Sequence, residues 1–399
     1  MTEGARAANG TTGDTPILPK PFTLLQVTPR LNAGGVERLT IDVARAVAAA
    51  GARSLVASHG GRLEAMLASG GGELIRLPVQ SKNPLVIAAN AVRLARLIRR
   101  ERVSLVHVRS RAPAFSALMA ARATGVPLVA TYHGIYGAKS VLKRWYNAVM
   151  TRGDLVIANS AFTRDHVLAQ HPAVAGKLVV IHEGVDTDLF DPAAVSADRL
   201  AAVRAAWGLA PDDHRRVLLL AARLTGWKGQ DMIVRAMRRM AGREGVVLIL
   251  AGRVESLGYA RQIQIAAAAA GVVDQVRLVG AVDDMPAAYG LADLVLAPST
   301  SPESFGRGVA EAGAMRRPVL ASDLGGPAET VIDGKTGWLA PPGDVDAWTR
   351  ALDAALSVTP QTLAVMGRAA RARIEASYSL KAMCAATFAA YGRLVERRA

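Results

Sequence analysis

The chain has 399 residues, of which 51% are hydrophobic and 20% charged, so it can bury a large core, and its length favours two domains over one. Its formal net charge is +15, and its single cysteine excludes an internal disulfide framework and fits a reducing cytoplasm. No run of about 18 apolar residues occurs and residues 1–20 lack the apolar stretch of a signal peptide, which excludes an integral membrane protein and predicts a cytoplasmic one.

Strand-like apolar runs alternate with helical segments along the first half of the chain, after a polar segment at 1–21 that we expect to form a disordered tail. A strand at 22–28 is followed by a glycine turn and a helix. Further strands are expected at 54–58, 74–77, 105–108, 128–132 and 155–158, and a prominent helix is expected at 84–102. This alternation is typical of a doubly wound parallel sheet.

The alternation stops at 182–213, where Gly, Pro and Asp indicate a connection between domains. It then resumes with strands expected at 217–221, 246–251, 276–279, 294–297 and 318–321. The prediction is therefore an α/β protein with an N-terminal domain at 22–195, a C-terminal domain at 196–379 and a cleft between them. The last segment, 380–399, is helical and basic, and we expect it to pack back on the N-terminal domain.

Two glycines, Gly34 and Gly35, follow the first strand and precede a helix. Backbone N–H groups at such a helix start favour a phosphate or a polar substrate. A purely structural turn is the alternative.

Charged residues follow two strands of the second half. Arg223 and Lys228 lie on one loop, where two cations can converge on a diphosphate, although two solvated charges are the alternative. Glu303 and Glu311 follow the strand at 294–297, so that one carboxylate could bind sugar hydroxyls and the other a ribose.

These motifs resemble the family 4 retaining glycosyltransferases, which have the GT-B fold of two Rossmann-like doubly wound domains facing a central cleft. Further matching motifs are Asn159-Ser160 with Asp165, the hinge-like 181–186, the Gly-rich turn 325–329 and the turn 333–337. The resemblance extends from about Thr23 to Tyr378.

The resemblance implies a role for each matching residue of the C-terminal half. Arg223 and Lys228 should hold the donor diphosphate and stabilise the leaving nucleotide. Glu303, with the backbone of Phe305 and Gly306, should bind the hydroxyls of the donor sugar. These residues, together with Glu311 on the ribose, form the expected donor site.

The resemblance also implies roles for residues of the N-terminal half. His133, at a predicted strand end, should contact the donor sugar near the anomeric centre, and we count it with Arg223, Lys228 and Glu303 as catalytic; a core or capping histidine is the alternative. Gly35 should approach the diphosphate, and it forms the acceptor site with Gly34.

No metal and no cofactor is expected, because the nucleotide-sugar is itself a substrate. The sequence contains an Asp-x-Asp pattern at Asp186 and Asp188, but it falls inside the hinge motif, so we interpret it as turn chemistry. The histidines show no metal-ligand spacing.

A basic surface is predicted in the N-terminal half. Between Arg76 and Arg152 there are 14 Lys or Arg residues and a single acid, Glu101. Two groups are predicted to face a membrane: Arg93, Arg96, Arg99 and Arg100 on the amphipathic helix 84–102, and Lys139, Lys143 and Arg144 beside two aromatic residues. An ordinary Rossmann helix with a solvated face is the alternative for the first group.

Together these features predict a hexosyltransferase on the inner face of the cytoplasmic membrane. It would move a hexose from a UDP- or GDP-linked donor to an anionic envelope glycan or glycolipid, such as a lipopolysaccharide core or an exopolysaccharide precursor. Three alternatives stay open: a transferase with a soluble sugar acceptor, a nucleic-acid-binding protein and an inactive scaffold. No nucleic-acid partner is expected, because no RNP, zinc or helix-turn-helix motif is present.

Overall fold

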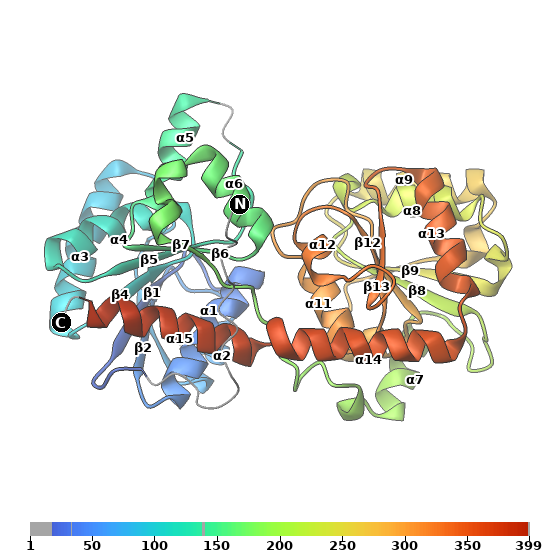
Figure 1. Ribbon diagram of the computed structural model, residues 1–399, viewed down its shortest axis with the longest axis horizontal. Helices are drawn as coiled ribbons and strands as arrows, with labels where there is room; N and C mark the ends of the chain where they lie inside the picture. The colour runs from blue at the N-terminus through green and yellow to red at the C-terminus, as the bar shows by residue number, and fades with distance from the viewer. Residues whose placement is uncertain (1–17, 33, 138–139, 398–399) are drawn as a thin grey trace, which may run out of the picture.

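The computed structural model describes residues 18–32, 34–137 and 140–397, which form two domains side by side (Figure 1). Each domain has a wholly parallel sheet covered by helices on both faces. The architecture confirms the predicted α/β fold with two Rossmann-like domains.

The N-terminal sheet has seven strands in the order β3-β2-β1-β4-β5-β6-β7. The strands are β1 (Thr23–Val27), β2 (Arg53–Ser58), β3 (Gly72–Arg76), β4 (Leu105–Val108), β5 (Leu128–Tyr132), β6 (Leu155–Ala158) and β7 (Leu178–Val180). The helices of this half are α1 (Gly35–Ala49), α2 (Glu64–Ser69), α3 (Pro84–Arg100), α4 (Arg111–Thr124), α5 (Val141–Asn147) and α6 (Ala161–Gln170).

The C-terminal sheet has six strands in the order β10-β9-β8-β11-β12-β13. The strands are β8 (Arg216–Ala221), β9 (Val246–Ala251), β10 (Val276–Gly280), β11 (Leu294–Ala297), β12 (Val319–Ser322) and β13 (Gly337–Ala340). The helices are α7 (Ala197–Ala206), α8 (Gln230–Met237), α9 (Leu257–Ala270), α10 (Met285–Leu291), α11 (Arg307–Ala314), α12 (Gly326–Thr330), α13 (Val345–Ser357), α14 (Pro360–Ser377) and α15 (Leu380–Glu396).

The sequence did not predict β7 and β13, each of which forms one edge of its sheet. Both are short, with three and four residues, and both are partly exposed. Both are apolar, with Leu178–Val180 in one and residues 338–340 in the other, but runs this short beside a hinge or turn motif are not told from a loop by hydrophobic pattern alone.

In both sheets the strand order reverses at the centre, between β1 and β4 in one and between β8 and β11 in the other. Loops at the carboxyl ends of strands that flank such a reversal form the usual ligand crevice of an open α/β sheet. The loops after β1 and β8 carry Gly34 and Lys228, and the loop after β11 carries Glu303. The topology therefore places these predicted site residues at the two crevices.

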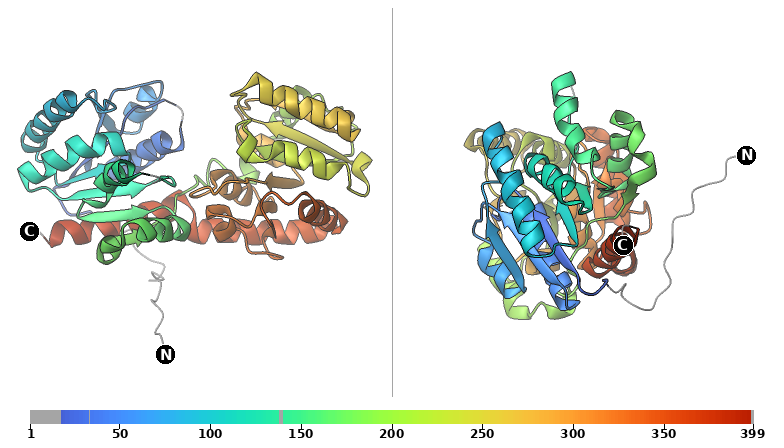
Figure 2. Two further views of the ribbon diagram at one scale, coloured as in Figure 1. Left: turned by 90° about the horizontal axis from the view of Figure 1, so that it is seen from above. Right: turned by 90° about the vertical axis from the view of Figure 1, so that its left-hand side faces the viewer.

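Helices α14 and α15 follow one another along one side of the molecule and span both domains (Figures 1 and 2). Side chains of α15, including Met383, Phe388 and Tyr391, are buried in the N-terminal core with Leu24 of β1. Leu18 is buried in the same cluster, so the part of the predicted tail that the structure describes is anchored at this residue, whereas residues 1–17 lie outside the described part. The local sequence could not show this, because the partner of Leu18 lies at the other end of the chain.

A buried polar chain joins α15 to the centre of the N-terminal sheet. His107 of β4 contacts the Tyr391 hydroxyl through Nδ1 at 2.6 Å and the Thr131 hydroxyl through Nε2 at 2.7 Å. Burial lowers the pKa of His107 well below its ordinary value, so the ring is neutral. The side chains fix α15 in one register, because an unpaired buried polar group would be costly.

Candidate functional site

Lys228 and Glu303 form an ion pair at the carboxyl edge of the C-terminal sheet. The Lys228 Nζ lies 2.7 Å from a Glu303 carboxylate oxygen, and both side chains are largely buried, with 14% and 18% exposed. The Ser299 hydroxyl donates to the other Glu303 oxygen at 2.5 Å. The two residues also line a small cavity of about 40 Å³ with Gly306 and Gly308. A cation and a carboxylate are thus fixed beside the start of α11.

A tight turn positions Lys228. Gly229 follows it with a φ of 75°, and a Cβ at that position would lie 2.2 Å from the carbonyl oxygen of Pro298. The Thr300 N–H donates to the carbonyl of Trp227 at 2.8 Å. The loops after β8 and β11 are therefore locked together, which only glycine at 229 allows.

Arg223 points elsewhere. Its guanidinium donates to Glu255 at 2.8 Å, and the side chain is 55% exposed. The two predicted diphosphate cations therefore lie on one loop but pair with different carboxylates. Their convergence on a diphosphate stays a prediction.

The start of α11 is shaped by close backbone packing. Phe305 is buried, and Gly306 caps the helix with a φ of 83°, where a Cβ would lie 2.6 Å from the Pro327 ring. Within the helix, Glu311 is held by the side chains of Arg307 and Tyr289, at 2.8 Å and 3.2 Å. The predicted donor-site residues Glu303, Gly306 and Glu311 therefore gather around one helix start.

His133 follows β5 and is held by a residue that the sequence analysis did not assign. Its Nδ1 lies 2.9 Å from a Glu183 carboxylate oxygen, which also accepts a bond from the Asn159 amide at 2.9 Å. Burial lowers the pKa of His133, whereas hydrogen bonds from His133 and Asn159 outweigh burial and lower the pKa of Glu183. A neutral imidazole thus donates Nδ1–H to an ionised carboxylate, which leaves Nε2 as an acceptor.

The ring of His133 is nearly covered, with 4% of the side chain exposed, and its Nε2 faces the buried Arg109 guanidinium at 3.5 Å. Direct contact with a donor sugar therefore stays a prediction.

The two buried histidines predict a pH-dependent stability. Because the pKa values of His107 and His133 are lowered in the folded chain, the unfolded chain binds more protons below about pH 6.5. We expect the free energy of unfolding to fall as the pH drops below that value, by up to about 1.4 kcal/mol per pH unit for each histidine. Urea unfolding between pH 7.5 and 5.5 measures this, and His107→Gln should reduce the slope. A flat profile would contradict the assignment.

Ser304 connects the loop that carries Glu303 to His133 across the two domains. Its hydroxyl donates to the His133 carbonyl at 3.0 Å and accepts from the Asn159 amide at 3.2 Å. The Glu303 loop and the backbone of His133 are therefore joined directly across the two domains.

A second bridge joins the domains through Glu329 of α12. Its carboxylate accepts bonds from the backbone N–H groups of Ala161 and Phe162, at 2.9 Å and 2.5 Å, at the start of α6. Burial raises the pKa of Glu329, but His182 and these two N–H groups outweigh burial and lower it. An ionised carboxylate at a helix N-terminus is stabilised by the helix dipole.

Gly34 and Gly35 lie at the start of α1. A Cβ at Gly35 would meet nothing within 4 Å, so its surroundings within the described residues are open, whereas one at Gly34 would overlap the Glu37 carboxylate. The opening fits the approach of a ligand, and the ligand itself stays a prediction.

Helix α3 is amphipathic, but its apolar face is already used. Leu94, Leu97 and Ile98 are buried in the N-terminal core. Its four arginines are exposed: Arg93, Arg96, Arg99 and Arg100. Because its apolar face is buried in the core, the structure favours the ordinary Rossmann helix for this segment. The sequence left both interpretations open, since periodicity alone cannot tell an apolar face that meets a sheet from one that meets a membrane. The arginines can offer charge to a surface, but the buried apolar face cannot insert, although Leu85 and Val92 of the same helix are exposed, at 80% and 51%.

Helix α5 differs, because its apolar side chains are exposed. Val141, Leu142 and Trp145 are 71%, 80% and 57% exposed, and they alternate with Lys143 and Arg144, which are also exposed. Figure 1 shows α5 standing out from the N-terminal domain. Lys139 lies outside the described residues.

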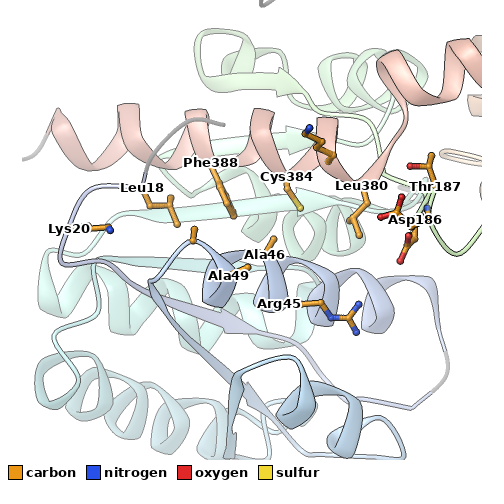
Figure 3. A pocket seen from close by; sticks show the side chains of 13 residues that line it. Leu18, Lys20, Arg45, Ala46, Ala49, Asp186, Thr187, Leu380, Cys384 and Phe388 are labelled. Atoms are coloured by element: carbon orange, nitrogen blue, oxygen red, sulfur yellow. Dashed lines mark hydrogen bonds between the residues drawn. The ribbon is translucent and has the colours of Figure 1, made fainter. Parts of the chain in front are cut away.

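A larger groove lies away from these residues, between α1 and α15 (Figure 3). Its volume is about 720 Å³, and apolar side chains of the two helices, such as Ala46, Cys384 and Phe388, face each other across it. None of the predicted site residues lines it, so its size does not make it the candidate active site.

The described residues contain no group of three or more His, Cys, Asp or Glu side chains that could hold a metal ion. Asp186 accepts bonds from the backbone N–H groups of Asp188 and Leu189, as a turn residue does. None of the helices described is long and apolar enough to span a membrane.

The sequence analysis missed four polar residues of the site: Glu183, Ser304, Arg307 and Glu329. Each lies inside a motif that the sequence made visible, namely the hinge motif, the segment from Glu303 to Glu311, and the late Gly-rich turn. The partners of Glu183, Ser304 and Glu329 lie far away along the chain or on the other domain, so the motif could mark these residues but could not assign a contact. Arg307 differs, because its partner Glu311 is four residues later on the same helix, a spacing that the sequence does show.

Comparisons with known proteins show the family and the fold of the chain. The model of Glycosyltransferase Family 4 matches residues 33–189, and that of Glycosyl transferases group 1 matches residues 205–373. A D-inositol 3-phosphate glycosyltransferase of Mycobacterium sp. (strain KMS) is 33% identical over 251 residues, which are 62% of this chain and 54% of that protein. The chain thus spans about half the length of the curated relatives it matches first.

Two solved structures are also similar. A glycosyltransferase from Rickettsia africae ESF-5 has a TM-score of 0.88 and 30% identity, with 95% of this chain and 100% of that chain covered. Anabaena Alr3699/HepE, solved in complex with UDP and glucose, has a TM-score of 0.77 and 22% identity, with 94% and 99% covered, which shows the fold alone. The chain therefore belongs to the glycosyltransferases of the GT-B fold, with a family 4 N-terminal domain and a group 1 C-terminal domain.

Proposed function

We propose that this protein is a retaining glycosyltransferase that transfers a hexose from a UDP- or GDP-linked donor. The observation that carries the proposal is the Lys228–Glu303 pair of 2.7 Å at the start of α11. It places a cation directly beside a carboxylate. In this proposal a bound donor replaces the ion pair, so that Lys228 binds the leaving phosphate and Glu303 binds the sugar hydroxyls.

The proposed chemistry follows from where charge develops. When the bond from the anomeric carbon to the phosphate oxygen breaks, negative charge grows on the departing diphosphate, and fixed cations and N–H groups stabilise it. Lys228 and the N–H groups at the start of α11 would do so, with Arg223 from the same loop. The acceptor oxygen forms the new bond on the same face and passes its proton to the departing phosphate, so no protein nucleophile is needed.

Binding of nucleotides tests the proposal first. We expect UDP or GDP to raise the melting temperature of the full chain, because a ligand at 100 times its Kd stabilises the native state by about 2.7 kcal/mol. ADP, CMP and RNA serve as comparison ligands. No response to any nucleotide at millimolar concentration would overturn the proposal and favour the inactive scaffold.

For the acceptor we propose an anionic molecule, with an envelope glycan or glycolipid as the first candidate. The excess of Lys and Arg between Arg76 and Arg152 supports an anion. A soluble phosphorylated acceptor is the second candidate, supported by the name of the inositol phosphate relatives. An assay with radiolabelled donor, comparing inositol 3-phosphate with a lipid-linked glycan extract, separates the two.

The proposed membrane contact is α5, with charge supplied by α3. Exposed apolar side chains interleaved with cations favour an anionic lipid surface. Arg152 adds a further cation above the Trp145 ring, at 5.8 Å.

Vesicle binding provides the corresponding prediction. The double change Leu142→Glu and Trp145→Glu should lower binding to vesicles with anionic phospholipid by about tenfold or more, because it removes apolar burial and reverses charge. The matched control is Leu257→Glu, which changes an equally exposed leucine of α9 in the other domain and should have no effect. Unchanged binding of the double variant, or equal loss in the control, would contradict a role for α5.

A further inference from the structure

Two side chains hydrogen-bond to Glu311, one to each oxygen of its carboxylate. The Arg307 Nε donates to one carboxylate oxygen at 2.8 Å, and the Tyr289 hydroxyl donates to the other at 3.2 Å. Tyr289 is 1% exposed and lies on α10, so its hydrogen bond to Glu311 joins α10 to α11. Burial beside Glu311 raises the pKa of the Tyr289 hydroxyl well above its ordinary value, which keeps it a donor.

Helix stability does not explain Arg307. It is the first residue of α11, where a cation opposes the helix dipole at a cost of about 0.3–1 kcal/mol. It also precedes its glutamate by four residues, which is the weaker order for an ion pair on a helix. A stability role alone would favour the reverse arrangement, so the position of Arg307 needs another reason.

The two hydrogen bonds leave the Glu311 carboxylate able to accept further hydrogen bonds from a ligand. An ionised carboxylate offers about four lone-pair sites, and Arg307 and Tyr289 occupy one on each oxygen. The Glu311 side chain is 15% exposed, so it is not sealed from solvent. With its rotation fixed on both sides, the carboxylate can accept two hydroxyl groups of one ligand without losing further side-chain entropy.

We propose that Arg307 and Tyr289 are positioning residues that hold Glu311 in the orientation that recognises the vicinal hydroxyls of a ribonucleotide donor. This inference rests on the proposed function, since it assumes a nucleotide in the crevice. Arg307 acts through Glu311 and carries no share of the reaction itself. The carboxylates of Asp42 and Glu183 in the N-terminal half also favour the charge of Arg307. The variants of Arg307 must therefore separate the loss of its charge from the loss of its hydrogen bond.

The test uses UDP or GDP, whichever binds the full chain more tightly. Calorimetry measures the affinity for this ribonucleotide and for its 2′,3′-dideoxy analogue, and the two affinities are compared. The wild-type protein should prefer the ribonucleotide by about tenfold or more, because hydrogen bonds to a charged group are lost in the analogue. Arg307→Met should lower this preference by about threefold or more and leave the affinity for the analogue unchanged. Tyr289→Phe should lower it as well, and Arg307→Lys should restore part of it.

A preference that is unchanged in Arg307→Met overturns the inference. Equal loss of both affinities also overturns it, because Arg307 would then bind a group that both nucleotides share, such as the diphosphate. Failure of the wild-type chain to bind either nucleotide overturns the proposed function and this inference with it, whereas nucleotide binding without ribose preference overturns this inference alone.

Discussion

Replacing Lys228 with alanine is expected to lower turnover by about a thousandfold, because it removes a fixed cation from a buried site where the leaving diphosphate gains charge. The change also leaves Glu303 without the partner that lies 2.7 Å from it. The effect is measured as the rate at which the nucleotide-sugar is turned over, which is monitored by the release of nucleoside diphosphate. Lys228→Arg should retain more activity, because the charge remains although the geometry changes.

The double variant Lys228→Ala with Glu303→Gln shows whether the loss comes from the missing cation or from the freed carboxylate. If the two residues act as one unit, the double variant should be about as inactive as either single one, because effects within one ion pair do not add. Lys335→Ala is the matched control, since Lys335 is exposed in the same domain. Activity of Lys228→Ala within about twofold of the wild type would contradict the diphosphate assignment.

Replacing Glu183 with alanine is the second change with a large expected effect, about a hundredfold in turnover. The carboxylate accepts from the Nδ1–H of His133 and from one N–H of the Asn159 amide, so its removal frees the histidine ring and leaves these two buried N–H groups unpaired, while the amide keeps its bond to Ser304. Each unpaired group is expected to cost about 1–3 kcal/mol of stability. Turnover and urea unfolding are measured on the same sample, so that loss of activity is not mistaken for loss of fold.

Glu183→Gln separates orientation from charge. The amide oxygen of glutamine can still accept the hydrogen bond from His133, so this variant should lose about tenfold less activity than Glu183→Ala. Nucleotide affinity should change little in both variants, since Glu183 lies on the His133 side of the site. Wild-type turnover in Glu183→Ala would show that the His133–Glu183 pair is only structural.

Most of the fold could be predicted from hydrophobic pattern, because inner parallel strands are continuous apolar runs. The exceptions were the edge strands β7 and β13, whose three and four residues do not stand out beside the hinge and turn motifs next to them. The periodicity of α3 was also recognised, but its use was not, because an apolar helix face has the same spacing whether it meets a sheet or a membrane.

The candidate site was predictable to the level of motifs, and contacts required the structure. Lys228 and Glu303 were both named from the sequence, but their pairing across 75 residues depends on two loops that Gly229 holds together. Arg223 lies on the same loop as Lys228 and turns to Glu255 instead. A motif specifies which residue types a crevice needs, whereas side-chain partners depend on packing between segments distant in sequence.

The position of α15 has a consequence for the order in which the chain acquires its structure. Tyr391 contacts His107, which lies 284 residues earlier, and the same helix completes the apolar core under β1. During synthesis from the N-terminus, the first domain therefore emerges long before one of its own core helices exists. It must wait with apolar surface uncovered while the second domain is made, and the two domains mature together instead of in sequence.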